Sequence, residues 1–207
     1  MPDLRERAFD LGMHGLLLHW DEISDADWLS WLVDIEEEER QRRSLERRIR
    51  NAKLGRFKSM ADFDWDWPEH LDRQQVEDLQ TLDFVREGIN CILVGPNGVG
   101  KTMLSKNLAH TALLAGFTVL FTTASAMLSD LASQDSASGL QRRLGRYCRP
   151  RLLCVDEVGY LSYGNRHADL LFEVVTRRYS DNKPTLVTTN KAFQEWNEVF
   201  PSAACVV

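Results

Sequence analysis

The stretch Cys91-Ile92-Leu93-Val94-Gly95-Pro96-Asn97-Gly98-Val99-Gly100-Lys101-Thr102 decides the fold. Its first four residues are continuously apolar, which is typical of a strand buried on both faces. Residues 95–102 fit the pattern G-x-x-x-x-G-K-[ST], and a helical pattern follows. A strand, a glycine-rich loop and a helix N-terminus in this order cradle phosphate, because backbone N–H groups and the helix dipole converge there. The stretch therefore predicts a P-loop nucleotide site.

The residues of this cradle have separate expected roles. Lys101 would neutralise the β and γ phosphates, and Thr102 would hold Mg²⁺ through its hydroxyl. The predicted cofactors are therefore ATP and Mg²⁺. The expected cofactor-binding residues are Gly95, Pro96, Asn97, Gly98, Val99, Gly100, Lys101 and Thr102.

Two acids follow a second apolar run, residues 152–155. Asp156 and Glu157 would then lie at the carboxyl end of a buried strand, where open α/β sheets bind ligands. We expect Asp156 to orient Mg²⁺ and Glu157 to polarise the attacking water. Neighbouring side chains on a strand point to opposite faces, so these two roles need not compete. The pair favours hydrolysis over transfer to a substrate hydroxyl.

A further polar residue, Asn190, follows the apolar run 185–188. It could bridge the γ-phosphate and the attacking water, or it could be an ordinary turn residue. The sequence thus predicts three catalytic residues and two metal ligands. The catalytic residues are Lys101, Glu157 and Asn190, and the metal ligands are Thr102 and Asp156.

The chain as a whole predicts an α/β fold of the P-loop class. Helical patterns separate four short apolar runs, which favours a parallel sheet sandwiched by helices. The runs are 91–94, 118–121, 152–155 and 185–188. Residues 1–59 are expected to form an N-terminal helical region and residues 60–207 the ATPase core. Residues 60–68 would be a connecting strap, because Pro68 and interleaved aspartates discourage a helix.

Composition limits the class of protein further. The 207 residues are 43 % hydrophobic and carry a net charge of −6, so the chain can bury a core. No apolar run approaches the roughly 18 residues that a membrane helix needs. The four cysteines form no C-x-x-C pair, which favours reduced thiols. A soluble cytoplasmic protein is expected.

One segment of this acidic chain is strongly basic. Between Arg40 and Lys58 there are nine basic residues and one acid, Glu46. We expect one long charged helix that continues through Arg56. Its basic side chains could contact DNA phosphates without sequence preference, or form a solvated face balanced by the preceding glutamates. The candidate DNA-binding residues are Arg43, Arg47, Arg48, Arg50, Lys53 and Arg56.

These motifs, in this order, resemble the AAA+ ATPases. The chain is most similar to the IstB-like transposase-helper branch, sister to the DnaC helicase loaders. The likeness rests on residues 95–102, 153–161, 170–179 and 188–190. It implies an ATPase that assembles on DNA as an ATP- and DNA-dependent homo-oligomer and assists a cognate transposase. Trp67 and Pro68, in the strap, are candidates for a position near the adenine.

The chain departs from that family after Asn190. The family continues into a segment with an arginine that reaches a neighbour's γ-phosphate, followed by a helical lid, whereas no arginine follows Asn190 here. We therefore expect ATP binding with weak hydrolysis, since such arginines contribute about 10³- to 10⁵-fold in rate. Arg177 and Arg178 could supply a substitute in trans, or be ordinary surface arginines.

Three other functions stay open at this point. A replicative helicase loader would share the fold and differ in its partner. A small-molecule kinase would also use a P-loop, but the Asp156–Glu157 pair argues against it. A non-catalytic binding module would occupy DNA or a partner without hydrolysing ATP.

Overall fold

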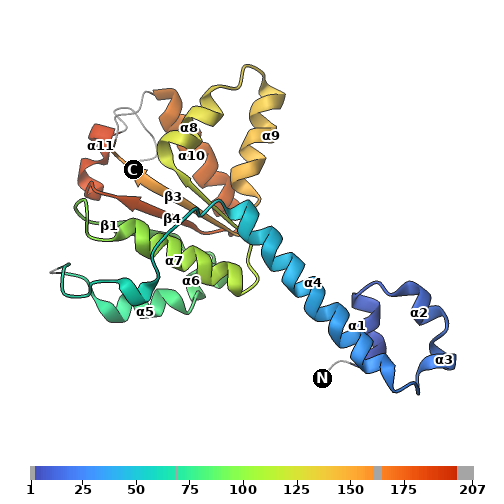
Figure 1. The fold of residues 1–207 in the computed structure, drawn as a ribbon. Coiled ribbons are helices and arrows are strands. Elements are labelled where there is room, and N and C mark those ends of the chain that lie inside the picture. Colours follow the sequence, from blue (N-terminus) through green and yellow to red (C-terminus); the bar gives the residue numbers. More distant parts are fainter. Residues whose placement is uncertain (1–2, 69, 161–164, 200–207) are drawn as a thin grey trace. The chain divides into compact units, whose positions relative to one another are not determined.

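The computed structural model describes residues 3–68, 70–160 and 165–199, and the chain divides into two compact units (Figure 1). The first unit is Met1–Arg47 and the second is Arg48–Val207. This division falls earlier than residue 59, and the functional boundary at 59 stays a prediction. The elements are α1 (Leu4–Asp10), α2 (His14–Leu18), α3 (Trp20–Ile23), α4 (Trp28–Ala52), the 3-10 turn η1 (Met60–Asp62), α5 (Arg73–Gln80), α6 (Asp83–Glu87), β1 (Cys91–Val94), α7 (Lys101–Leu114), β2 (Val119–Thr123), α8 (Ala124–Ala132), α9 (Ala137–Cys148), β3 (Leu152–Val158), α10 (Asn165–Ser180), β4 (Thr185–Thr189), η2 (Phe193–Glu195) and α11 (Trp196–Val199).

The first unit has a small apolar core of its own. Ala8, Leu11 and Val33 are buried together between α1 and the first part of α4. The Arg7 guanidinium donates hydrogen bonds to Asp34 and Glu37, at 2.6 Å each. These bonds hold α1 against α4, because one planar guanidinium can reach two carboxylates at once.

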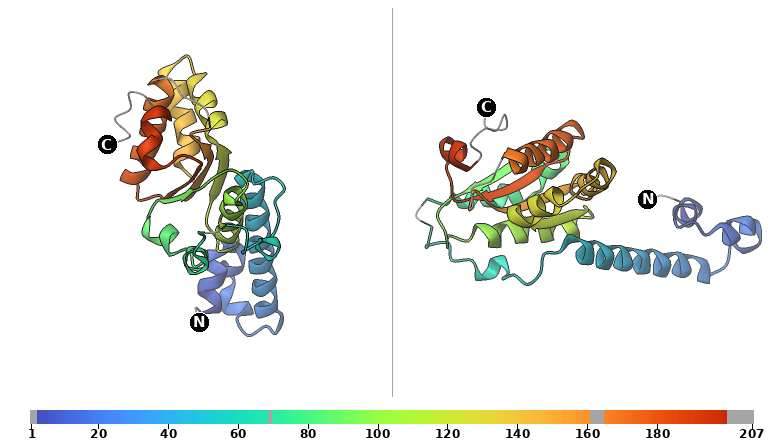
Figure 2. Two further views of the ribbon diagram at one scale, coloured as in Figure 1. Left: turned by 90° about the vertical axis from the view of Figure 1, so that its left-hand side faces the viewer. Right: turned by 90° about the horizontal axis from the view of Figure 1, so that it is seen from above.

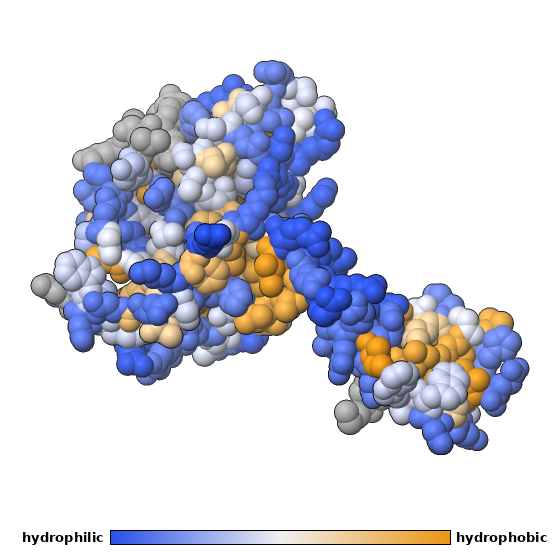
Figure 3. Space-filling view, in the orientation of Figure 1, coloured by the Kyte–Doolittle hydropathy of each residue, from blue (hydrophilic) through white to orange (hydrophobic). Residues whose placement is uncertain are grey.

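Helix α4 is densely charged from Glu36 to Arg50 and ends at Ala52. The surface of its middle part is hydrophilic in Figure 3, and Glu36–Arg40 and Glu39–Arg43 pair four residues apart at 2.6 Å. The expectation that it continues through Arg56 is wrong by one turn. Lys53 has φ 58° and Gly55 has φ 63°, and left-handed backbone of this kind ends a helix.

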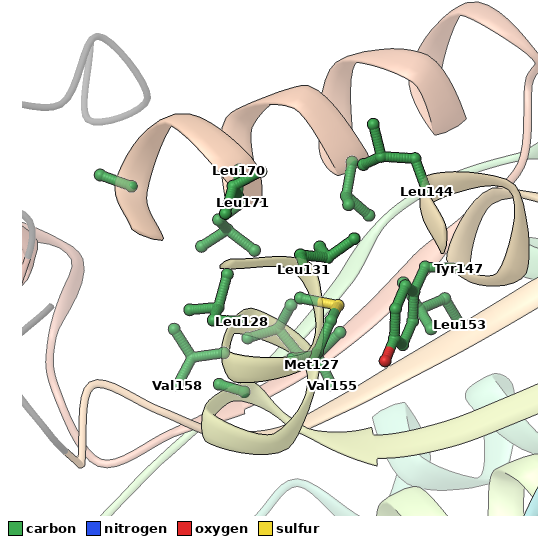
Figure 4. Packing of buried hydrophobic residues seen from close by; sticks show 14 of the residues in the cluster. Met127, Leu128, Leu131, Leu144, Tyr147, Leu153, Val155, Val158, Leu170 and Leu171 are labelled. Carbon is green, nitrogen blue, oxygen red and sulfur yellow. The ribbon is translucent and has the colours of Figure 1, made fainter. Parts of the chain in front are cut away.

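The second unit is built on a four-stranded parallel sheet, as the apolar runs predict. The strand order is β1-β4-β3-β2, and every neighbouring pair is parallel. Helices cover both faces (Figures 1 and 2): α6 and α7 pack on one, and α8, α9 and α10 on the other. Figure 4 shows the second layer, where Met127, Leu128 and Leu131 of α8 meet sheet residues Leu153, Val155 and Val158. The predicted α/β sandwich is confirmed.

Strand β1 differs from the expectation of burial on both faces. Cys91 and Leu93 pack towards α7, whereas Ile92 and Val94 are 44 % and 56 % exposed. The reason is its place at the end of the strand order. On the face of Ile92 the buried cluster draws its sheet residues from β2, β3 and β4.

Among the described residues, no helix is long and apolar enough to cross a membrane.

Candidate nucleotide site

The phosphate cradle lies between the end of β1 and the start of α7. Gly98 and Gly100 have φ 88° and 93°, a conformation that only glycine adopts without strain. Gly100 is the N-cap of α7, a helix of 14 residues, so the first N–H groups of that helix lack intrahelical partners. The N–H of Gly95 donates to the carbonyl of Thr189, which fixes the cradle to the end of β4 (3.2 Å). An anion is favoured at this point.

The three predicted motifs meet around one cavity of about 320 Å³. It opens at the carboxyl edge of the parallel strands, where open α/β sheets bind ligands. Gly95, Pro96 and Val99 belong to the cradle without lining this cavity. The lining residues are Asn97, Gly98, Gly100, Lys101, Thr102, Glu157, Tyr160, Thr188, Thr189 and Asn190.

Lys101 lies at the floor of the cradle. Its ammonium donates hydrogen bonds to the carbonyls of Gly95 and Pro96, at 2.7 Å each. Burial lowers the pKa of this ammonium from its ordinary value, while the Asp156 and Glu157 carboxylates oppose the shift. The cavity is therefore lined by a partly desolvated lysine whose ammonium donates to two carbonyl oxygens of the phosphate loop.

Thr102 and Asp156 meet beside it. The Thr102 hydroxyl lies 3.1 Å and 3.0 Å from the two carboxylate oxygens of Asp156. Asp156 is 4 % exposed, so this pair is held in place by the strand and the helix around it. A hydroxyl and a carboxylate are hard oxygen donors of the kind that Mg²⁺ prefers, so the predicted metal ligands fit the ion.

Glu157 reaches the cavity by a route that regular strand geometry does not provide. Simple alternation would place its side chain on the Val155 face, beneath α8 and α10. Instead Glu157 has φ 63° at an irregularity in the pairing of β3 with β4. Its side chain is exposed and lines the cavity, as does that of Asn190.

Three lining residues were missed by the sequence patterns, namely Tyr160, Thr188 and Thr189. Tyr160 follows β3 in a loop, and no periodicity marks it. Thr188 lies at the end of the apolar run 185–188, and nothing in the sequence distinguishes it there. Its role depends on contacts with the neighbouring strand β3. Its hydroxyl donates to Asp156 Oδ1 (2.5 Å) and accepts from the Glu157 N–H (2.9 Å).

The strap contacts the cradle through Phe63, and the place of Trp67 and Pro68 near the adenine stays a prediction. Trp67 is 67 % exposed, and neither Trp67 nor Pro68 lines the cavity. Phe63, which is 8 % exposed, packs on Gly100 and meets Trp65 edge to face, with ring centroids 4.9 Å apart. The strap is thus tied to the end of the phosphate loop.

The candidate DNA-binding residues fall into two groups. Arg43 pairs with Glu39, and Arg48 donates to the Leu113 carbonyl at the end of α7. Arg48 is therefore engaged in packing. The others have exposed side chains without a hydrogen bond or ion pair to any described residue; they are Arg47, Arg50, Lys53 and Arg56.

The two arginines considered as substitute fingers have different environments. Arg177 pairs with Glu173 on the same helix (2.5 Å). Arg178 is 1 % exposed, so the alternative of an ordinary surface arginine is wrong for it, and its burial also keeps it from reaching another chain. Its five N–H donors go to five acceptors: Thr185 Oγ1 and the carbonyls of Tyr147, Pro150, Arg151 and Pro184.

Solved structures with this fold include replication proteins. The chain superposes on DnaI with a TM-score of 0.58 and 22 % identity, covering 74 % of this chain and 86 % of that one. AMPPCP-bound DnaA from Aquifex aeolicus gives a TM-score of 0.57 at 19 % identity, covering 66 % and 44 %. These likenesses show the fold, a P-loop NTPase of the AAA+ type.

Sequence relatives are more specific. The family model described as IstB-like ATP binding protein matches residues 18–206. The protein named as ATP-binding in insertion sequence IS5376 of Geobacillus stearothermophilus is 33 % identical over 86 % of this chain and 70 % of its own length. Its counterpart in IS21 of Pseudomonas aeruginosa is 34 % identical over 86 % and 67 %. The chain spans about two thirds of the length of these relatives and less than half of DnaA. By the family match and these identities, the chain belongs to the IstB-like ATP-binding proteins.

Proposed function

We propose that this chain binds ATP with Mg²⁺ in the cavity at the carboxyl edge of the sheet and hydrolyses it. The observation that supports this most is the meeting of Lys101, Glu157 and Asn190 around one cavity. An ammonium from α7, a carboxylate from β3 and an amide from the residue after β4 line this cavity at a helix N-terminus. Transfer of a γ-phosphoryl group to water uses a cation on the phosphates and polar groups that position and deprotonate the water, and these three groups can supply both.

The binding half of the proposal rests on the cradle. The N–H groups that begin α7 and the Lys101 ammonium would hold the phosphate oxygens. The N–H groups are partly positive hydrogen-bond donors, and the ammonium carries a full positive charge. Thr102 and Asp156 would hold Mg²⁺, which when bound neutralises charge on the phosphates. Relatives named as ATP-binding proteins support this half.

The hydrolytic half rests on Glu157 and Asn190. The exposed Glu157 carboxylate would accept the proton of a water in the cavity. The Asn190 amide would orient that water, because it can donate and accept at once. Each would act from the end of a different strand, β3 or β4.

Nucleotide binding is measured with a fluorescent ATP analogue and Mg²⁺. Lys101→Met should abolish the fluorescence change, whereas Lys106→Met, on the same helix outside the cavity, should retain it. Glu157→Gln should bind the analogue but lose turnover by about 10²- to 10⁴-fold. Unaltered binding in Lys101→Met contradicts the cradle assignment, and unaltered turnover in Glu157→Gln contradicts the base.

The same proposal extends to DNA and a transposase. The family match and the insertion-sequence relatives support a helper that assembles on DNA and assists the transposase of its own element. Arg50, Lys53 and Arg56 of the second unit would contact phosphates, since their exposed side chains have no hydrogen bond or ion pair to any described residue. Light scattering should show a large assembly only with ATP analogue and duplex DNA together. A monomer under all conditions contradicts this part.

A further inference from the structure

Strand β3 carries a bulge at its two acids, and one residue of β4 lies opposite both. Val155 pairs with Val187 and Val158 pairs with Thr189, so Asp156 and Glu157 together face Thr188. One extra residue on one strand is a β-bulge, which bends the strand and redirects a side chain. Because of it, Val155 and Val158 both enter the same core cluster.

The bulge separates the two acids. Asp156 turns inwards to Thr102, and Glu157 turns outwards into the cavity. The turn requires φ 63° at Glu157, a left-handed conformation that costs free energy for any residue with a Cβ. A strained residue of this kind persists only where its surroundings hold it.

The Thr188 hydroxyl makes two contacts that hold Glu157 in this conformation. It donates to Asp156 Oδ1 at 2.5 Å and accepts the Glu157 N–H at 2.9 Å. A hydroxyl has one proton and two lone pairs, so a single side chain can serve both acids. Thr188 is 1 % exposed, and water therefore cannot replace it in either bond.

We infer that Thr188 is a positioning residue, whose hydroxyl holds the β3 bulge so that Glu157 faces the cavity while Asp156 stays against Thr102. This inference rests on the proposed ATPase function. Thr188 is on β4, two residues before Asn190, which follows the strand, so it also ties the strand that precedes the amide to the strand of the base. Loss of the hydroxyl should slow turnover through Glu157 without weakening nucleotide binding.

The test compares Thr188→Val, which keeps the shape and removes the hydroxyl, with Thr188→Ser, which keeps the hydroxyl. The Val variant should lower kcat at least tenfold with KM for ATP within about twofold, and the Ser variant should restore kcat. Combined with Glu157→Gln, the Val substitution should cause no further loss, because both act through one group.

Thr185→Val is the matched control. Thr185 is a second buried threonine of β4, and its hydroxyl accepts from Arg178 at the other end of the strand. It should lose stability and keep kcat. If Thr188→Val behaves like Thr185→Val, the inference is overturned and the ATPase proposal stands.

A crystal structure of Thr188→Val gives a readout that needs no turnover. The inference expects the bulge to relax and Glu157 to leave the cavity, and an unchanged φ at Glu157 overturns it. If the wild type itself binds ATP but shows no turnover, the hydrolysis proposal fails. The crystal structure of Thr188→Val then tests by itself whether the Thr188 hydroxyl holds the bulge. Thr188→Ala takes the place of the Val variant if the latter does not fold.

Discussion

Phe63 occupies the space that a side chain at Gly100 would need. A Cβ added to Gly100 would lie 2.6 Å from Phe63 Cε2, closer than real Cβ contacts come. Phe63 belongs to the strap and Gly100 to the phosphate loop, so two segments far apart in sequence depend on each other. Asn107 of α7 holds the same strap, accepting the Met60 N–H and donating to the Lys58 carbonyl.

We therefore predict that Gly100→Ala destabilises the protein by more than Gly98→Ala does. Both glycines have left-handed φ, which costs alanine about 1–2 kcal/mol. A Cβ at Gly98 meets nothing within 4 Å, so only Gly100→Ala adds overpacking, of about 1–3 kcal/mol. Urea unfolding measures both variants.

The contact is isolated by repeating the pair of variants in a Phe63→Ala background. Removal of the ring should itself cost about 3–5 kcal/mol, and the excess cost of Gly100→Ala should then disappear. An excess that persists without the ring would mean that Phe63 is not its cause.

Local patterns in the sequence were enough for much of this fold. A few consecutive residues were enough to predict each of three features: the cradle, the four strands and the Asp156–Glu157 pair. The exposed face of β1 could not be predicted in this way, because strand order is a property of the whole sheet. The apolar letters of Ile92 and Val94 alone cannot tell an end strand from a central one.

The parts of the site that were missed depend on contacts between strands. The expected side-chain direction at Glu157 assumes that β3 pairs with β4 without interruption, and no residue type in the sequence indicates the bulge. Thr188 and Arg178 have partners on other elements, so their roles appear only in three dimensions. Phe63 was likewise hidden among the aromatic residues of the strap.

Arg178 should be the costliest arginine of the second unit to replace. Arg178→Lys removes a fork that satisfies five acceptors and leaves several of them buried without donors, at about 1–3 kcal/mol each. Burial already lowers the pKa of Arg178 to about 10. We expect a loss of at least about 3 kcal/mol in the free energy of unfolding.

Arg177→Lys is the control for that substitution, since Arg177 is a neighbouring arginine on the helix surface. Its pair with Glu173 is partly solvated, and its loss should change stability by no more than about 1 kcal/mol. Equal effects of the two substitutions would contradict the central role of Arg178.

The described cysteines should resist alkylation in the folded protein. Burial raises the pKa of the Cys154 thiol to about 12 and that of Cys91 to about 11. The thiolate is the reactive form, so raising the pH from 7 to 9 should scarcely increase their modification, unlike that of an ordinary thiol. Peptide mass spectrometry after iodoacetamide treatment measures this, with urea-unfolded protein as the fully reactive reference. Rapid native labelling of Cys154 would contradict its burial; Cys205 lies outside the described residues.

The proposed DNA contact predicts a specific salt dependence. Each phosphate neutralised by a basic side chain contributes about 0.9 to the slope of log affinity against log salt concentration. Replacing Arg50, Lys53 and Arg56 by Gln should therefore weaken duplex binding and reduce that slope by about 3. Fluorescence anisotropy on two unrelated duplexes measures the slope, and the loss should be the same on both.

The control removes the same charge from arginines that already have partners. Arg73, Arg86 and Arg177 are paired with Glu77, Asp83 and Glu173. Their replacement by Gln changes the net charge equally, but a carboxylate already neutralises each of them, so the slope should stay near its wild-type value. If both triple variants reduce the slope alike, net charge alone governs binding. Arg50, Lys53 and Arg56 would then have no special part in DNA recognition, because their side chains would act no differently from arginines that are paired with carboxylates elsewhere on the surface.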